Sequence, residues 1–421
     1  MNVAVIGSGG REHAICESLI KSKKIKKLYC LPGNGGTESI AQNISIDLSN
    51  FKEIKDFVKK NKINLVVVGP EKPLVEGITD YLEKYKIKVF GPNKFASKLE
   101  GSKIFTKKIC KKYKIPTANF VVKQNIKQSL EHIRKAKFPL IIKADNLASG
   151  KGVYICKNRT EAIKAIEDIF NGKFGEAKKI LFEDFLQGEE MSYFIISDGL
   201  SFKYFGSAQD HKRVLEGDKG KNTGGMGAYS PSRLFSKQLE KKIIQKIIKP
   251  TLKALKDKKK KFKGFLYAGL MINNNEPYLI EYNVRMGDPE CQTILPNLRN
   301  DFLDLLIACC NNKLSKKKIN WSKKKSICIV LCSKGYPDKF KKNIEIKNLD
   351  KIKKKKNEFI FHAGTLKKDN NYFSTGGRVL NFVSTSLNLS QSRNQVLKII
   401  KNLNWQNGFC RKDIGYKVIK K

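Results

Sequence analysis

The chain has 421 residues, more than one ordinary hydrophobic core accommodates, so two to four domains or subdomains are expected. Its residues are 40% hydrophobic and 29% charged, a balance that excludes an intrinsically disordered protein. The 84 lysines and arginines outnumber the 39 acidic residues, which gives a formal net charge of +45.

So large a positive charge first suggests a nucleic-acid-binding protein. The lysines are, however, scattered along the whole chain, and the dense runs contain no aromatic residues on which bases could stack. We interpret the excess as a compositional drift over tolerant surface positions and expect no specific nucleic-acid partner. The densest runs are Lys258–Lys261, Lys316–Lys318, Lys323–Lys325 and Lys353–Lys356.

The chain opens on the strand-like segment Met1–Ile6, without the pattern of a signal peptide, and no apolar run approaches the length of a membrane span. Ten cysteines include no Cys-x-x-Cys pair, and there are only four histidines, so neither a zinc site nor a disulfide framework is indicated. Free thiols in a reducing cytosol are the simplest interpretation, and we expect a cytoplasmic protein without a membrane partner.

Residues 1 to about 100 alternate short apolar runs with helix-like segments, which is typical of a parallel βαβ sheet that binds ligands beyond the carboxyl ends of its strands. The first turn, Gly7–His13, fails the dinucleotide fingerprint because Glu12 occupies the last glycine position, so a nicotinamide cofactor is not expected. Its backbone N–H groups still suit a single phosphate. The loops Pro32–Thr37 and Gly69–Glu71 would border the same crevice. Alternatively, these glycines only close tight turns.

From Glu100 onward the sequence pattern changes, and it predicts a lysine-rich helix and then an apolar strand that ends at Lys143. A lysine at the end of a buried strand is costly unless it meets an anion. The loop Asn146–Gly152 and a second strand, Val153–Cys156, follow, which predicts a hairpin able to cover a triphosphate. It is not a Walker loop, and it can also be read as purely structural.

Two later segments suit an adenine nucleotide and an anionic substrate. The strand Lys179–Glu183 ends in a loop whose backbone, near Glu183 to Leu186, could bind an adenine edge, and Glu190 could hold ribose hydroxyls. The basic segment Gln209–Arg213 precedes the glycine cluster Asn222–Pro231, a combination that favours a carboxylate or phosphate.

The segment Pro277–Glu290 carries the strongest chemical signal. Tyr278, Ile280, Tyr282 and Val284 alternate with Leu279, Glu281, Asn283 and Arg285, which predicts a strand with one largely apolar face. The apolar run Gly264–Ile272 and the asparagines 273–275 make it the second strand of a hairpin. On the polar face, Glu281 and Asn283 suit a hard cation such as Mg²⁺, and Arg285 could meet phosphate oxygens. The alternative is an amphipathic strand with a solvated face. From Ser326 the tail reads as a small α/β unit.

At this point the chain resembles the phosphoribosylamine–glycine ligase (glycinamide ribonucleotide synthetase) family of the ATP-grasp superfamily. The resemblance covers the whole chain, and its motifs occur in family order: VIGSGGREHA, LPGNGGT, VVGPEKPLVEGI, LEGSKIFTK, IIKADNLASGKGV, QDHKR, NTGGMGAYSP, GFLYAGLM, EYNVRMGDPE, FHAGT, GGRVL and FCRKDIGY.

The resemblance implies an α/β and α+β multidomain fold: an N-terminal Rossmann-like (pre-ATP-grasp) substrate domain at residues 1–101, an ATP-grasp domain at 102–322 with a mobile lid at about 118–190, and a C-terminal α/β domain at 323–421. It implies that ATP, with Mg²⁺ or Mn²⁺, activates glycine as an acyl phosphate, which 5-phosphoribosylamine then attacks to form glycinamide ribonucleotide, in purine synthesis. A monomer or homodimer is expected.

The resemblance also assigns site residues. Glu281 and Asn283 would hold the metal and Arg285 the transferring phosphate. The ATP site would comprise Lys103, Lys143, Ser149, Gly150, Lys151, Gly152, Glu183, Asp184, Phe185, Leu186 and Glu190. The glycine and amine pocket would comprise Asp210, Lys212, Arg213, Asn222, Asp288 and Glu290. Gly9, Gly10 and Asn34 are the expected contacts of the ribose phosphate.

Three alternatives stay open. The first is another ATP-grasp carboxylate ligase of purine synthesis, which uses bicarbonate or formate, although the GDPE and NTGGMGAYSP runs argue against it. The second is a nucleic-acid-binding protein, whose binding must depend on salt. The third is a binding module that has lost turnover, against which the intact Glu281, Asn283 and Arg285 speak.

Overall fold

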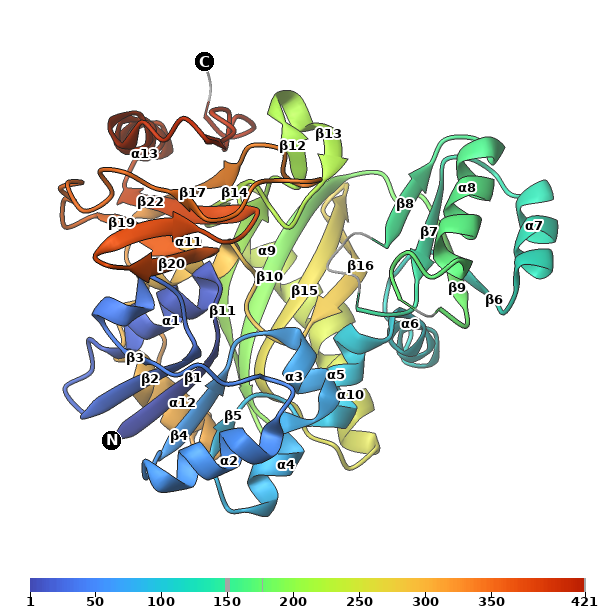
Figure 1. The fold of residues 1–421 in the computed structure, drawn as a ribbon. Coiled ribbons are helices and arrows are strands. Elements are labelled where there is room, and N and C mark those ends of the chain that lie inside the picture. Colours follow the sequence, from blue (N-terminus) through green and yellow to red (C-terminus); the bar gives the residue numbers. More distant parts are fainter. Residues whose placement is uncertain (148–151, 176, 420–421) are drawn as a thin grey trace.

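The computed structural model describes residues 1–147, 152–175 and 177–419. Its first unit is a five-stranded parallel sheet in the order β3-β2-β1-β4-β5, at the lower left of Figure 1. The strands are β1 (Asn2–Gly7), β2 (Lys27–Pro32), β3 (Gln42–Asn43), β4 (Leu65–Val68) and β5 (Val89–Phe90). The order reverses between β1 and β4, so the loops after these two strands meet at the carboxyl edge of the sheet, where such folds bind ligands.

Six helices surround this sheet or lead out of it. They are α1 (Gly10–Leu19), α2 (Phe51–Lys60), α3 (Glu71–Glu76), α4 (Ile78–Lys84), α5 (Lys94–Gly101) and α6 (Lys103–Lys112). Several begin at a side-chain cap: Asn50, Asn93 and Ser102 each accept a hydrogen bond from a backbone N–H three residues later. The cap at Ser102 starts the predicted lysine-rich helix directly after α5.

The second unit is a four-stranded antiparallel sheet in the order β6-β9-β7-β8, which projects to the right in Figure 1. It contains β6 (Phe120–Lys123), β7 (Leu140–Ala144), β8 (Val153–Cys156) and β9 (Ile180–Asp184), with α7 (Ile126–Arg134) and α8 (Arg159–Phe170). The unit has a small hydrophobic core of its own, which includes Ile142, Ile166 and Phe182. The predicted hairpin is confirmed, because Leu140 pairs with Cys156. We call this unit the lid; its mobility stays a prediction.

The third unit is a nine-stranded sheet that runs from the centre of the molecule into its C-terminal part. Eight strands follow the order β16-β15-β10-β11-β14-β17-β22-β19, and β23 (Gly408–Phe409) pairs with β17. The eight are β10 (Glu189–Asp198), β11 (Phe202–Asp210), β14 (Gly227–Ser230), β15 (Lys263–Asn273), β16 (Glu276–Asn283), β17 (Lys325–Ser333), β19 (Glu358–His362) and β22 (Arg378–Ser386). Antiparallel pairing of β14 with β17 joins the central and C-terminal strands into one sheet.

The predicted hairpin before the metal-type residues is confirmed as β15 and β16, joined by Asn274 and Asn275 with φ of 48° and 60°. The prediction that apolar and polar residues alternate strictly along β16 is wrong. A register shift pairs Gly269 with Glu281 but Leu270 with Leu279, so the strand bulges at Ile280. Leu279 is therefore buried together with Tyr282, whereas Tyr278 and Ile280 are partly exposed.

Short elements complete the architecture. The remaining helical segments are α9 (Lys237–Ile243), α10 (Lys249–Asp257), α11 (Glu290–Ile294), α12 (Phe302–Cys310), α13 (Leu389–Leu403), a π-helical turn at Ile244–Ile248 and 3-10 turns at Thr37–Ser39, Glu216–Asp218, Leu295–Asn297 and Leu314–Lys316. The remaining strands are β12 (Arg213–Leu215), β13 (Lys219–Asn222), β18 (Ile344–Glu345), β20 (Thr365–Lys368) and β21 (Asn371–Ser374). None of the helices within the described ranges combines the length and apolar character that crossing a membrane requires.

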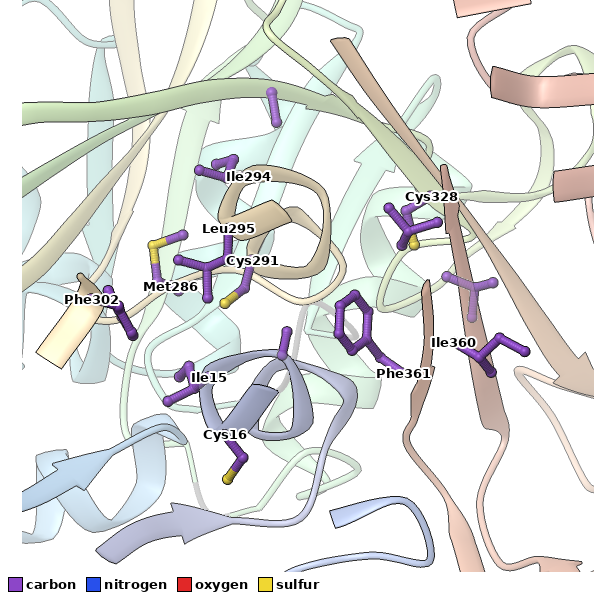
Figure 2. Close-up of a cluster of buried hydrophobic side chains, with 14 of the residues drawn as sticks. Ile15, Cys16, Met286, Cys291, Ile294, Leu295, Phe302, Cys328, Ile360 and Phe361 are labelled. Atoms are coloured by element: carbon purple, nitrogen blue, oxygen red, sulfur yellow. The ribbon is translucent and has the colours of Figure 1, made fainter. Parts of the chain in front are cut away.

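One hydrophobic cluster fastens the N-terminal, central and C-terminal parts to each other. Figure 2 shows Ile15 and Cys16 on α1, Cys291 and Leu295 from the segment after β16 above this helix, and Phe361 of β19 alongside; Cys16 points from the other side of α1. All five side chains are buried. The N-terminal sheet, the central sheet and the C-terminal strands therefore form a common frame, from which the lid projects as a separate unit (Figure 1).

Candidate active site

A cavity of about 790 Å³ lies between the lid, the end of β16 and the loops of the N-terminal sheet. Most of the predicted site residues line it: Lys103, Lys143, Glu183, Asp184, Phe185, Leu186, Glu190, Asp210, Lys212, Arg213, Asn222, Glu281, Asn283, Arg285, Asp288 and Glu290. Gly152 is buried in the turn directly before β8, next to the lining residue Val153. Ser149, Gly150 and Lys151 lie outside the described residues.

Two buried lysines share one glutamate beneath the lid sheet. Lys143 Nζ lies 2.9 Å from Glu183 Oε1, and Lys107 Nζ lies 3.0 Å from Glu183 Oε2. Burial opposes ionisation of Glu183, but the two lysines outweigh it and hold the pKa of that carboxyl below its usual value. Burial lowers the pKa of Lys107. We call these residues the lysine cluster; with all three ionised it carries one uncompensated positive charge, which suits a phosphate.

Lys103 begins α6 and faces the same space from the other side. Its Nζ donates to the backbone oxygen of Asn146 at 3.0 Å, and burial lowers its pKa while the nearby Glu281 carboxylate opposes that effect. Asp145 fixes the start of the helix by accepting hydrogen bonds from Ser102 Oγ and from the backbone N–H of Ile104, both at 3.0 Å. The lysine is therefore held between the loop after β7 and the end of β16.

The predicted adenosine segment forms the wall between lid and central sheet. Phe185 is 40% exposed although it is a large aromatic residue, so its ring is available to a ligand. Asp184 Oδ2 accepts a hydrogen bond from Asn119 Nδ2 at 2.9 Å, which ties the segment to the residue directly before β6. The carboxylate of Glu190 accepts a hydrogen bond from Lys212 Nζ, and this lysine lowers the pKa of Glu190.

The end of β16 offers two side-chain oxygens to the cavity. Glu281 and Asn283 both line it, two residues apart and beyond the bulge. The Glu281 carboxylate lies within electrostatic range of Lys103 and Lys212, and Asn283 Oδ1 accepts a hydrogen bond from Arg285 Nη2 at 3.1 Å. A carboxylate and an amide oxygen are a donor pair that fits a hard divalent cation, so these residues suit Mg²⁺ or Mn²⁺.

Arg285 is held by two glutamates from other parts of the chain. Its Nη2 donates to Glu100 Oε1 at 2.7 Å, and its Nε lies 3.3 Å from Glu71 Oε2. Glu71 also lies 3.9 Å from Arg11 Nη1, and Arg11 Nη1 donates to the backbone oxygen of Met286. We call Arg11, Arg285, Glu71 and Glu100 the arginine bridge, because it joins α1, α3 and α5 to the end of β16.

Charge within the arginine bridge is nearly balanced. Burial disfavours the cation of Arg285, but Glu100 and Glu71 outweigh it and raise the pKa of Arg285. Burial raises the pKa of Glu100 to about 7, against the opposing charge of Arg285. The bridge therefore places a permanent guanidinium cation beside a carboxyl group that titrates near neutrality.

Three acids and one lysine gather at the opposite wall. Burial raises the pKa of Asp210 to about 7, and the carboxylates of Glu290 and Glu190 add to the effect against Lys212. Burial opposes the charged form of Lys212, but Asp210 and Glu190 raise its pKa well above the usual value. Glu290 is buried and accepts a long hydrogen bond from Ser192 Oγ at 3.4 Å. Such a group of acids suits a cationic amine.

The two remaining members of the predicted substrate pocket are held differently. Asp288 Oδ1 accepts a hydrogen bond from Gln292 Nε2 at 2.8 Å and lies 3.3 Å from Arg378 Nη2. Arg213 and Asn222 pair across the β12–β13 hairpin, and Arg213 Nη1 donates to the backbone oxygen of Gly220 at 2.8 Å.

The predicted ribose-phosphate residues lie outside the lining of the cavity. The N–H of Gly9 already donates to Glu12 Oε2 at 2.6 Å. The amide of Asn34 donates to the backbone oxygens of Ser8 and His362, both at 2.9 Å. A Cβ at Gly10 would lie 2.3 Å from Asn381 Nδ2. These contacts tie the turn after β1 to the C-terminal strands, and the phosphate role stays an untested prediction.

Several cavity residues escaped the sequence reasoning. Lys107 lies four residues after Lys103, one helical turn along α6, so the spacing offered a signal for a second inward lysine. Arg11, Glu71, Glu100 and Arg378 also line the cavity. Arg11 and Glu71 belong to turns that are predicted to border the crevice, although the sequence assigned no role to their side chains. No local pattern marks Glu100 and Arg378, which reach the cavity because the domains pack together.

Comparison with known proteins identifies relatives that match this chain over its whole length. The family models described as the N domain, the ATP-grasp (A) domain and the C domain of phosphoribosylglycinamide synthetase match residues 1–100, 101–291 and 326–417. The phosphoribosylamine–glycine ligase of Brucella melitensis is 40% identical over 422 residues, 100% of this chain and 99% of that protein. Its counterpart in Agrobacterium fabrum is 42% identical over 420 residues, with 100% and 99% coverage.

Solved structures agree with the sequence relatives. The phosphoribosylamine–glycine ligase of Thermotoga maritima superimposes with a TM-score of 0.85 at 31% identity, covering 98% of this chain and 100% of that one. The biotin carboxylase of Campylobacter jejuni has a TM-score of 0.71 at 15% identity, covering 94% and 89%, which shows a shared fold alone.

Proposed function

This chain belongs to the phosphoribosylamine–glycine ligase family, and from that premise we propose how its cavity performs the ligation. The enzyme joins glycine to 5-phosphoribosylamine with ATP, a step of purine synthesis, and gives glycinamide ribonucleotide, ADP and phosphate. The observation that carries the residue assignment is the convergence of the lysine cluster, Glu281, Asn283 and Arg285 on one cavity.

The chemistry divides into two transfers. A glycine carboxylate oxygen attacks the γ-phosphorus of ATP, the bond to the β-phosphate oxygen breaks, and glycyl phosphate and ADP result. The amine of phosphoribosylamine then attacks the carbonyl carbon, the C–O bond to phosphate breaks, and the amine loses a proton. Phosphoryl transfer needs little covalent assistance, so the task of the protein is to position the reactants and neutralise charge.

The lysines neutralise the phosphates. Lys103 and Lys143 contact the α- and β-phosphates, and Lys107 supports them by sharing Glu183 with Lys143, 3.0 and 2.9 Å away. The positive charge left in the lysine cluster is then matched by the nucleotide. Glu183 thus acts by orienting the two lysines, while the backbone of residues 183–186 and the side chain of Glu190 hold adenosine.

Glu281 and Asn283 are the proposed ligands of the divalent cation, Mg²⁺ or Mn²⁺. When bound, such a cation neutralises charge on the phosphate oxygens. Arg285 reaches the transferring phosphate from a position set by Glu100 and Asn283, at 2.7 and 3.1 Å from its Nη2. A guanidinium held on two sides is already ordered before the substrate arrives.

The acids opposite the metal residues receive the amines. We assign Asp210, Lys212, Arg213, Asn222, Asp288 and Glu290 to the glycine and phosphoribosylamine pocket. Lys212 and Arg213 attract the anionic groups of the substrates, whereas Asp210 and Glu290 face the ammonium. Because the pKa of Asp210 is about 7, it can take up the proton that the attacking amine releases.

The larger organisation follows from these roles. We propose the division into residues 1–101, 102–322 and 323–421, with a lid at about 118–190 that closes over ATP through the loop containing Ser149 to Gly152. A cytoplasmic monomer or homodimer without nucleic-acid or membrane partners is consistent with this assignment.

The test is substrate-dependent release of ADP. Purified protein is given ATP, Mg²⁺, glycine and freshly generated phosphoribosylamine, and each component is omitted in turn. Release that requires both glycine and the amine supports the assignment. Release with bicarbonate or formate in place of glycine would move the chain to the related ligases, and a lack of release would favour the binding-module alternative.

A further inference from the structure

The β12–β13 hairpin, residues 213–222, carries two of the proposed substrate residues but lacks a sheet to support it. Within the described part of the chain, β12 and β13 pair only with each other. Most of its residues are exposed, and Leu215 is 56% exposed. An isolated two-stranded ribbon is only marginally stable in water, so the orientation of Arg213 and Asn222 requires an external support.

That support comes from the C-terminal segment, residues 411–417, which lies next to the hairpin (Figure 1). Arg411 is 1% exposed. Its Nε and Nη2 donate to the two carboxylate oxygens of Asp413 at 2.9 and 2.8 Å, and its Nη1 donates to Asp218 Oδ1 at 2.8 Å. The same Nη1 donates to the backbone oxygen of Arg213 at 3.0 Å. The guanidinium therefore connects the start of β12 with the turn of the hairpin.

Four further contacts repeat the connection. The backbone N–H of Gly217 donates to Asp413 Oδ2 at 2.9 Å, and that of Lys412 donates to Glu216 Oε1 at 3.1 Å. The Tyr416 hydroxyl donates to Asp218 Oδ2 at 2.9 Å. The backbone N–H of Gly415 donates to Nε2 of His211, the residue just before Lys212, at 3.2 Å.

The cavity lining ends at this connection. Asp218 and Lys417 both line the cavity, with Lys417 Nζ 3.3 Å from Asp218 Oδ2, whereas Arg411 does not line it. Burial works against ionisation of Asp218, yet Arg411 and Tyr416 hold its pKa near 2, so the pairing persists at neutral pH. Arg411 can thus influence substrates only indirectly, through the hairpin and the C-terminal segment that it holds.

We propose that the C-terminal segment forms part of the substrate pocket and that Arg411 is a positioning residue that sets Arg213 and Asn222 against phosphoribosylamine and glycine. The inference rests on the proposed role of the hairpin in substrate binding. It makes the last residues of the chain a determinant of substrate affinity, separate from the ATP site beneath the lid.

The test compares Arg411→Gln and Asp218→Asn with the matched control Lys412→Gln, whose exposed side chain leaves the backbone contact to Glu216 in place. Asn tolerates the positive φ of 56° at position 218, so Asp218→Asn keeps the turn and serves even if Arg411→Gln folds poorly. We expect the KM for phosphoribosylamine and glycine to rise about 10- to 100-fold, with the KM for ATP unchanged. In a further variant, Arg411→Ala, added guanidinium should partly restore the KM for phosphoribosylamine and glycine.

Arg213→Ala, measured in the same assay, separates the two ideas. If it raises the KM for phosphoribosylamine while Arg411→Gln and Asp218→Asn leave every KM unchanged, the positioning role of Arg411 is refuted and the substrate role of the hairpin remains. If Arg213→Ala has no effect, the proposed role of the hairpin is itself wrong. If Arg411→Gln and Asp218→Asn raise the KM values for phosphoribosylamine, glycine and ATP equally, Arg411 has only a general structural role, and this outcome would also overturn the inference.

Discussion

The lysine cluster and the arginine bridge both place buried cations at the same cavity, but they differ in how completely those cations are paired. In the lysine cluster, one carboxylate serves two ammonium groups. In the arginine bridge, Glu100 and Glu71 surround Arg285, and Glu71 also approaches Arg11. The first arrangement leaves charge for a ligand, and the second uses its charges to fix a geometry.

The difference separates binding from orientation. An under-paired cation in a buried site is costly until an anion arrives, so the lysine cluster favours occupation by the nucleotide. A guanidinium with two carboxylates is already neutralised and ordered, so Arg285 contributes through its position. Substitutions in the two groups should therefore change different kinetic quantities.

The largest effect is expected at Glu281, which lines the same cavity as both groups. Glu281→Ala removes the carboxylate proposed for the metal, and turnover should fall to the assay background while the fold persists, because this side chain lines the cavity. ADP release and thermal unfolding test this together. Glu276→Ala on the same strand removes only the surface pairs with Lys242 and Lys246 and should stay active. Near-normal Mg²⁺-dependent turnover of Glu281→Ala would refute the metal assignment.

Arg285→Ala tests whether the arginine bridge acts by orienting a cation. If the guanidinium stabilises charge that develops in the transition state, kcat should fall on the order of 10²–10³-fold, with a smaller change in the KM for ATP. Arg285→Lys should not restore the rate, because an ammonium cannot bridge Glu100 and Glu71 in the same way. Arg299→Ala, at an exposed site, is the control. Equal rates for Arg285→Ala and the parent would make Arg285 a structural residue.

Lys107→Met tests whether the lysine cluster acts by binding the nucleotide. It keeps the apolar stem but removes one cation from the lysine cluster, which loses a charge-assisted interaction worth about 1.5–3 kcal/mol. We expect the KM for ATP to rise about tenfold, which corresponds to about 1.4 kcal/mol, with kcat little changed. The neighbouring Lys108 is exposed, so Lys108→Met is the matched control. A lower kcat at unchanged KM would assign Lys107 to stabilisation of the transition state and would show that the lysine cluster and the arginine bridge affect the same kinetic quantity.

The smallest effect on turnover is expected at His13, which lies on α1 with Arg11 and contributes to stability. Its Nδ1 accepts the backbone N–H of His362 at 2.9 Å, so it must be neutral, and burial lowers its pKa well below the ordinary 6.5. The contribution of neutral His13 to the free energy of unfolding is therefore complete above pH 6.5, the pKa of histidine in the unfolded chain, and is lost as the pH falls toward the lower pKa of the folded state. Relative to His13→Gln, the free energy of unfolding should fall by about 1.4 kcal/mol per pH unit below 6.5. Urea titrations at pH 7.5, 6 and 5 measure this, and a constant difference would show that His13 does not titrate.

Local patterns predicted much of this architecture. The strand β8 occurs at the predicted residues, Val153–Cys156, and the predicted strand Lys179–Glu183 corresponds to β9 at Ile180–Asp184. The hairpin before Glu281 followed from the run of asparagines. These features depend on side-chain periodicity and turn chemistry within a few residues, which one sequence contains in full.

What escaped prediction depends on contacts between distant segments. Alternation along β16 could not reveal the bulge at Ile280, because a bulge is a property of the paired strand and its neighbour. Glu100 was visible only as the beginning of a motif, although it contacts Arg285, 185 residues later. Asn34 lies in a glycine-rich loop whose composition is typical of a ligand-binding loop, but its amide joins the turn after β1 to His362.

The sheet that continues from β14 into β17 has a consequence for biosynthesis. On the ribosome, β14 (Gly227–Ser230) emerges long before its partner β17 (Lys325–Ser333), so one edge of the central sheet waits unpaired during translation. An exposed edge strand readily pairs with other chains. Nascent or prematurely terminated products that end before β17 are therefore the species most exposed to aggregation, and chaperones should engage the chain at this stage of its synthesis.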